Sequence, residues 1–232
     1  VSPLQTEINS VIALYSNGQI QEALGAVEAL IKDYPNDSLL FNISGACYAG
    51  LGQFDDAVKD YEKAIAIKPD YSKAHFNLGC TLQELGQLDA SAKSFEKALV
   101  IEPDYAEAHN NLGIALKDLR QLDAAVKSFK KAIAIKPDYV EAHYSLGTSF
   151  QELGQLNAAV KSYEEVLAIK PDFAKMHNNL GIVFQELDQL DAAVKSFEKA
   201  ISIKPDFADA HYNLGSMFKE LGQLDAAIRC YE

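Results

Sequence analysis

Polar side chains that could bind a ligand recur along this chain at multiples of 34 residues. Four asparagines share this spacing: Asn77, Asn111, Asn179 and Asn213. An acidic series has the same spacing: Glu84, Asp118, Glu152, Glu186 and Glu220. An asparagine side chain offers two donors and one acceptor, so a row of asparagines can bind the backbone of an extended peptide whatever its sequence. A row of carboxylates would favour lysine or arginine in that peptide.

The five histidines recur at the same interval, which raises the question of a metal site. They are His75, His109, His143, His177 and His211. Equivalent helices of a stack lie roughly 8–10 Å apart, whereas each zinc ligand lies about 2 Å from its ion. We therefore expect these side chains to fill a packing position and to share no metal. Because the chain also lacks a glycine-rich phosphate loop, a paired-histidine motif and a nucleophile elbow, we expect no catalytic residue and no cofactor within it.

Proline spacing shows how these residues are organised. Six prolines are separated by 34 residues each: Pro35, Pro69, Pro103, Pro137, Pro171 and Pro205. Such a period is typical of a solenoid rather than of a chain with two unrelated domains. With proline at place 32 of each repeat, residues 1–37 form a degenerate N-terminal capping repeat and residues 38–207 form five full repeats. Residues 208–232 form a partial seventh repeat.

Each repeat is expected to hold two amphipathic helices, because apolar residues recur at helical spacing in its two halves. The break between these helices falls at a residue suited to the left-handed conformation: Gly52, Gly86, Gly154 or Gly222, with Arg120 and Asp188 in two repeats. Between repeats, proline disfavours helix at the preceding residue. The pairs Asp104 with Glu107 and Asp138 with Glu141 have the spacing of a capping box. The expected fold class is all-α.

The chain resembles the tetratricopeptide repeat family over almost its whole length. In residues 174–207 the positions of that family's pattern are His177, Leu180, Gly181, Phe184, Ala193, Phe197, Ala200 and Pro205. A glycine at place 8 allows close approach of a partner helix, and the aromatic residue at place 24 fills the space between repeats. The resemblance implies a right-handed superhelical α-solenoid of stacked antiparallel helix pairs that acts as a scaffold for protein binding. The first repeat departs from the pattern at Glu7, Val11 and Val27.

The resemblance also implies that places 2, 6, 9 and 13 of the first helix line the concave surface, where ligands of this family usually lie. The asparagines at place 6 are similar to the asparagine ladder in the repeats of O-linked N-acetylglucosamine transferase, with Ser145 as an interruption. Alternatively, they bond their own helix or a neighbouring side chain. The acidic column at place 13 would select basic peptides, or else is a solvated face or pairs with lysines such as Lys117 and Lys219.

Place 5 alternates between an amide and a ring along the chain. Its residues are Asn42, Phe76, Asn110, Tyr144, Asn178 and Tyr212. This rhythm suits a groove edge that grips alternate side chains of a ligand, although packing against the adjacent helix would explain the rings equally well. Chaperone-binding members of the family use lysine at place 5 and asparagine at place 9. This chain has neither, so the same clamp for a terminal carboxylate is not expected.

Composition limits the partners and the location. With 48% hydrophobic and 23% charged residues the chain can bury a core, and its formal charge of −12 would repel nucleic acid and anionic membranes. No apolar run approaches the roughly 18 residues of a membrane span, and the first residues lack the order of a signal peptide. We therefore expect a soluble, cytoplasmic protein. Three cysteines without motif spacing are expected to be small buried residues.

The function that these features predict is a non-catalytic scaffold that binds a protein or peptide, with a basic peptide favoured. One alternative is a substrate-recruiting N-terminal arm of a larger transferase, similar to a glycosyltransferase, whose catalytic domain lies beyond residue 232. Another is a structural array that associates end to end, because Leu224, Ile228 and Tyr231 lack a covering neighbour in the last repeat.

Overall fold

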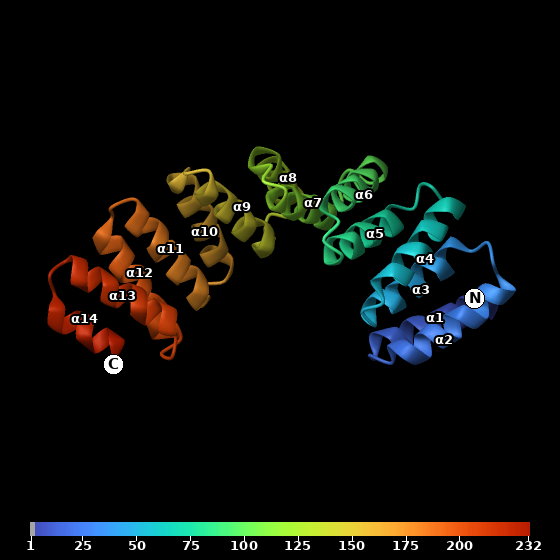
Figure 1. Cartoon of the computed structure of the whole chain (residues 1–232), viewed down its shortest axis with the longest axis horizontal. Coiled ribbons are helices and arrows are strands. Elements are labelled where there is room, and N and C mark those ends of the chain that lie inside the picture. The colour runs from blue at the N-terminus through green and yellow to red at the C-terminus, as the bar shows by residue number, and fades with distance from the viewer. Residues whose placement is uncertain (1–2) are drawn as a thin grey trace. The chain divides into compact units, whose positions relative to one another are not determined.

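The computed structural model describes residues 3–232, and that part of the chain consists of α-helices joined by short turns, without a β-strand (Figure 1). It folds as two compact bodies: Val1–Gln121, hereafter the N-terminal body, and Leu122–Glu232, the C-terminal body. The all-helical class predicted from the 34-residue period is confirmed. Within residues 3–232, no helix has the length and apolar character needed to cross a bilayer.

Each body is a series of helices of nearly constant length. The N-terminal body holds α1 (Pro3–Ser16), α2 (Ile20–Asp33), α3 (Ser38–Gly50), α4 (Phe54–Ile67), α5 (Ser72–Glu84), α6 (Leu88–Ile101) and α7 (Ala106–Asp118). The C-terminal body holds α8 (Leu122–Ile135), α9 (Val140–Glu152), α10 (Leu156–Ile169), α11 (Ala174–Glu186), α12 (Leu190–Ile203), α13 (Ala208–Glu220) and α14 (Leu224–Tyr231).

Helices pack in tandem pairs within each body. The first helix of a repeat packs against the second helix of the same repeat, as α3 does on α4 and α11 on α12. The second helix then packs against the first helix of the following repeat, as α4 does on α5 and α12 on α13. First helices of successive repeats also touch: α3 contacts α5, α5 contacts α7, and α11 contacts α13. Residues at one place of successive first helices are therefore near neighbours within a body.

The turns between paired helices have the predicted left-handed residues. Backbone φ is positive at Gly18, Gly52, Gly86, Gly154 and Gly222, and at the two non-glycine residues Arg120 and Asp188. A side chain in this conformation brings Cβ close to the following carbonyl oxygen, which is why glycine predominates at this place. The prediction that Arg120 and Asp188 replace glycine in the same conformation is confirmed.

The predicted capping boxes are wrong. The N-cap residue of α7 is Tyr105 and that of α9 is Tyr139, and neither helix has a side-chain hydrogen bond from its N-cap. The aspartate predicted to cap each helix lies one residue too early. The first full repeat differs, because Asp37 occupies the N-cap of α3 and accepts hydrogen bonds from the backbone N–H groups of Leu39 at 2.8 Å and Leu40 at 3.3 Å.

The histidines hold the linkers between repeats. Each histidine places Nε2 2.8–3.0 Å from the carbonyl oxygen of the proline six residues earlier, in the pairs His75–Pro69, His109–Pro103, His143–Pro137, His177–Pro171 and His211–Pro205. A carbonyl only accepts, so Nε2 carries the hydrogen in each case. The histidines thus tie the proline turn to the following helix. Among the described residues, no three histidine, cysteine or acidic side chains are grouped so that they could hold a metal.

The glycine at place 8 makes room for the ring at place 24 of its own repeat. A Cβ added at Gly147 would lie 2.4 Å from Cε1 of Tyr163, and one added at Gly79 would lie 2.7 Å from Cε1 of Phe95. Both rings are fully buried. The close approach predicted at these glycines therefore exists, and the approaching group is an aromatic ring.

Candidate functional site

The place 6 asparagines lie on the first helices of four repeats. Asn77 on α5 and Asn111 on α7 belong to the N-terminal body, whereas Asn179 on α11 and Asn213 on α13 belong to the C-terminal body. All four side chains are half-buried. Because first helices of successive repeats touch within a body, each body presents two of these amides on adjacent helices.

Two of the four amides are held by an asparagine of the preceding repeat. The Nδ2 group of Asn77 donates to Oδ1 of Asn42 at 3.0 Å, and that of Asn213 donates to Oδ1 of Asn178 at the same distance. Asn42 and Asn178 are each only 5% exposed. A primary amide has two N–H donors and a carbonyl, so this bond leaves Asn77 and Asn213 with one N–H and one carbonyl for other partners.

Asn111 is engaged differently. Its Nδ2 lies 3.4 Å from Sγ of Cys80, a weak acceptor, and its Oδ1 accepts a hydrogen bond from Nδ2 of Asn110 at 3.2 Å. Asn110 is 3% exposed, and its own Oδ1 is buried without a hydrogen-bond partner among the described residues. Asn110 and Asn178, both predicted to contact a peptide, are therefore buried against neighbouring side chains.

The rings at place 5 pack against the ring at place 24 of the same repeat. Ring centroids lie 6.2 Å apart for Tyr144 and Tyr163, and 6.0 Å apart for Tyr212 and Tyr231. This is the packing alternative stated for the rings. Tyr144 is half-buried, whereas Tyr212 is 66% exposed.

The acidic residues at place 13 are all exposed: Glu84, Asp118, Glu152, Glu186 and Glu220. Two of them, Glu186 and Glu220, link adjacent repeats through hydrogen bonds. Nε2 of Gln151 donates to Glu186 at 2.7 Å, and Nε2 of Gln185 donates to Glu220 at 3.4 Å. The partners of these two carboxylates are thus glutamines at place 12 of the preceding repeat. A carboxylate that accepts one hydrogen bond retains further acceptor sites for a basic side chain.

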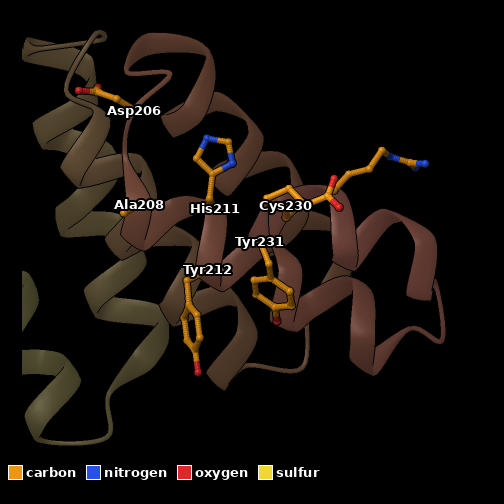
Figure 2. Close-up of a pocket in the computed structure, with 8 residues that line it drawn as sticks. Asp206, Ala208, His211, Tyr212, Cys230 and Tyr231 are labelled. Atoms are coloured by element: carbon orange, nitrogen blue, oxygen red, sulfur yellow. The ribbon is translucent and has the colours of Figure 1, made fainter.

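A pocket of about 400 Å³ opens beside α13 and α14, with Tyr212, Cys230 and Tyr231 among its lining residues (Figure 2). Tyr231 is 50% exposed, whereas its equivalents Tyr163 and Phe197 are fully buried. In the preceding repeats the corresponding surface is covered by the next first helix, as α12 is by α13. The exposed apolar end predicted from the last repeat is present, and end-to-end association stays a prediction.

The thiols of Cys47 and Cys80 are not activated as nucleophiles. Burial raises the pKa of Cys47 to about 11, and it also raises the pKa of Cys80 to about 11 despite the hydrogen bond from Asn111. Both thiols are therefore neutral near pH 7, and the thiolate is the reactive form. Cys47 is buried as predicted, whereas Cys80 and Cys230 are only partly buried, so the prediction of three buried cysteines is wrong for these two.

The fold and this arrangement of first helices define a solenoid of repeated helix pairs, and comparison with known proteins names its class. The TPR repeat family matches residues 45–86, 81–119, 115–154, 147–188 and 185–222. The chain belongs to this family.

Curated relatives match only short stretches. The peroxisomal targeting signal receptor of Candida glabrata is 30% identical over 67 residues, which cover 29% of this chain and 11% of the receptor. The Hsp70-Hsp90 organising protein of Plasmodium falciparum is 36% identical over 67 residues, 28% of this chain and 26% of that protein. This chain therefore spans only a small part of the length of these relatives.

Solved structures resemble the chain over more of its length. The crystal structure of MamA is 29% identical with a TM-score of 0.68, covering 71% of this chain and 96% of MamA. The C-terminal part of a TPR repeat-containing protein from Cytophaga hutchinsonii is 18% identical with a TM-score of 0.82, covering 96% of this chain and 93% of that chain. YrrB, described as a TPR protein with an unusual peptide-binding site, is 22% identical with a TM-score of 0.70, covering 80% of this chain and 95% of YrrB. At 18% and 22% identity the last two likenesses concern the fold alone.

Sequence reasoning identified the amide and acidic columns and gave a bond to a neighbouring side chain as an alternative for the amides, but it did not identify which side chains hold them. The signal for the amide pairs was present, because asparagine at place 5 precedes Asn77 and Asn213 by 35 residues in both cases. The glutamines at place 12 stand in the same relation to Glu186 and Glu220.

Proposed function

We propose that this chain is a non-catalytic scaffold that binds an extended peptide segment of another protein along the first helices of its repeats. The place 6 asparagines bind the peptide backbone, and the place 13 carboxylates favour lysine and arginine in it. The asparagine ladder of the glycosyltransferase repeats is the pattern that this proposal extends to Asn77, Asn111, Asn179 and Asn213.

The observation that carries the proposal is the state of the held amides. Asn77 and Asn213 are half-buried, and each is fixed by one hydrogen bond on the neighbouring helix. The second N–H and the carbonyl match the carbonyl and N–H of a peptide unit, which gives affinity without reading sequence. An amide already fixed loses less side-chain freedom when it binds.

The family supports the general class of function. Membership of the TPR repeat family is shown by residues 45–222, and one structure of the same fold is described as having a peptide-binding site. The curated relatives are named as a targeting signal receptor and as organisers of Hsp70 and Hsp90, which are functions in recognising other proteins. A transferase arm and a cytoplasmic location stay predictions.

The test uses a defined probe. A fluorescein-labelled peptide of alternating lysine and alanine, blocked at both ends and about twelve residues long, would extend roughly 40 Å and so span several first helices. Changing Asn77, Asn111, Asn179 and Asn213 to alanine should weaken its binding at least tenfold while leaving helix content unchanged. The matched control changes four exposed glutamines that are the N-cap residues of second helices and whose side chains make no cap hydrogen bond: Gln53, Gln87, Gln155 and Gln223.

Charge preference is tested with the same scaffold. A peptide with glutamate in place of each lysine should bind more weakly than the lysine peptide. Raising the salt concentration should reduce this difference in affinity between the two peptides. Equal loss of affinity in the asparagine and glutamine variants, or the lack of binding for both peptides, would contradict the proposal.

A further inference from the structure

The asparagines at place 5 are placed to act on the ladder rather than on a ligand. Asn42 on α3 and Asn178 on α11 are 5% exposed, so almost none of either side chain is open to solvent. Their carbonyl oxygens accept from the amides of Asn77 and Asn213 at 3.0 Å. Both contacts join a first helix to the next first helix in the same body.

The same bond does not form where place 5 of the preceding repeat is aromatic. Tyr144 precedes Asn179 in this register, and its ring packs against Tyr163 instead. Within the described residues, the side chain of Asn179 has no hydrogen bond. Phe76 precedes Asn111 in the same way, and Asn111 instead turns its Nδ2 to the sulfur of Cys80 and accepts at Oδ1 from Asn110 of its own helix.

The difference matters because an asparagine side chain has a broad χ2 distribution when nothing holds it. A held amide presents its remaining N–H and carbonyl in one orientation, whereas an unheld amide must be ordered by the ligand. Ordering a side chain on binding costs free energy, so a held amide contributes more to affinity for the same contact.

We propose that Asn42 and Asn178 are positioning residues that fix the side-chain amides of Asn77 and Asn213 in one orientation. Each body then has one place 6 amide that is held by the place 5 asparagine of the preceding repeat, Asn77 in the N-terminal body and Asn213 in the C-terminal body. The consequence for binding rests on the proposed function, whereas the positioning itself does not. A peptide that binds the ladder then meets Asn77 and Asn213 already oriented, whereas it must order the side chain of Asn179.

The positioning is tested without any ligand. In Asn178→Leu, which removes the acceptor at similar volume, the side-chain NH₂ signals of Asn213 should shift in a ¹⁵N–¹H spectrum and exchange faster with water. Asn178→Asp keeps an acceptor at the same place and should leave the Asn213 amide slow to exchange. Tyr144→Phe, at place 5 of the preceding repeat, is the matched control and should not affect Asn213. Unchanged Asn213 signals in Asn178→Leu would overturn the inference.

The effect on binding is tested by a double-mutant cycle with the lysine–alanine probe. Asn178→Leu should weaken binding about three- to tenfold, the range expected for loss of one net hydrogen bond. In an Asn213→Ala background the same substitution should cause no further loss, because its effect passes through Asn213. Circular dichroism must show unchanged helix content, and Asn178→Asp should retain most of the affinity.

The outcomes separate the two proposals. If Asn178→Leu weakens probe binding equally in the wild-type and Asn213→Ala backgrounds, its effect is a general structural one. That result would overturn the positioning role. If the wild-type chain does not bind the probe while the Asn213 signals respond as expected, the peptide-binding function is wrong and the positioning of the amide stands.

Discussion

The contact between place 8 glycine and place 24 ring gives a sharp prediction for Gly147→Ala. The new Cβ would lie 2.4 Å from Cε1 and 2.6 Å from Cδ1 of Tyr163, a ring that is fully buried. Overpacking a buried site costs about 1–3 kcal/mol, and this contact places the cost near the upper end. Alanine returns about 1 kcal/mol of helix propensity relative to glycine. The net loss in free energy of unfolding is therefore about 2 kcal/mol.

Gly25→Ala is the matched control. Gly25 lies inside α2, is exposed, and a Cβ there would have nothing within 4 Å. The substitution should therefore raise the free energy of unfolding by up to about 1 kcal/mol through propensity alone. The free energies of unfolding of the two Gly→Ala variants should therefore differ by about 3 kcal/mol, with Gly147→Ala below wild type and Gly25→Ala above it.

Urea unfolding followed by far-ultraviolet circular dichroism measures both variants. Because stability in a repeat array is a sum of local terms, hydrogen exchange of α9 and α10 amides gives the local readout that the global transition averages. Gly147→Ala should accelerate exchange in these two helices first. Stabilisation of the chain by Gly147→Ala to the same degree as by Gly25→Ala would refute the argument that the ring occupies the space of a Cβ.

Three further predictions concern a helix cap, a hydrogen bond in a linker, and groups whose pKa is raised by burial. Asp37→Ala should lower the free energy of unfolding by about 1 kcal/mol, because it removes the acceptor for two backbone N–H groups of α3; Asp37→Ser should recover most of this loss in the same urea titration. His109→Phe should cost about 1 kcal/mol through loss of the hydrogen bond to Pro103, and a melting temperature equal to wild type would contradict that role. Burial raises the pKa of Cys47 and Cys80 from 9.0 to about 11, and it also raises the pKa of Tyr61. The folded state therefore binds these protons more tightly than the unfolded chain does. The free energy of unfolding should therefore fall as pH rises from about 9 to 11, which denaturant titrations across that range would measure.

The helix pairs could be predicted from the sequence because one period specifies several features together. The 34-residue interval places a proline, a left-handed residue and an aromatic ring in each repeat, and these constraints agree with one another. Arg120 illustrates the strength of this inference best, because arginine rarely adopts positive φ, yet φ is 62° at this residue. Aspartate tolerates the left-handed region better, and φ is 57° at Asp188.

The helix starts could not be predicted from the capping-box pattern, because contacts with residues outside its four positions fix the linker. The linker before α9 is held by the bond from His143 to Pro137 and by Lys136, whose Nζ lies 4.9 Å from the ring centroid of Tyr139. With the linker fixed in this way, Tyr139 becomes the N-cap residue and the preceding aspartate lies outside the helix. A capping-box pattern reports only the local preference, which here is overridden.

The candidate site could be predicted only as columns of residue types. A periodic sequence shows that amides recur on one stripe, but the side-chain torsion decides whether an amide faces a neighbouring helix or solvent. Here the amides do both, since Asn213 gives one N–H to Asn178 and remains half-buried. Neither alternative stated for the ladder was complete, because the bond to a neighbouring side chain leaves hydrogen-bonding groups for a ligand.

The alternation at place 5 distinguishes residues that the fold requires from residues that adjust the site. Asn178 and Tyr144 occupy the same place in the C-terminal body, and each finds a partner within the stack. Packing is satisfied by either choice, so it does not explain why the two types alternate. What differs between them is the next amide: Asn213 is held and Asn179 is not. The variant Tyr144→Asn, which has asparagine at both positions, should therefore fix the Asn179 amide in the same way and raise affinity for the lysine–alanine probe. If exchange of the Asn179 side-chain amide with water is not slower in this variant, an acceptor at place 5 is not enough to fix the next amide.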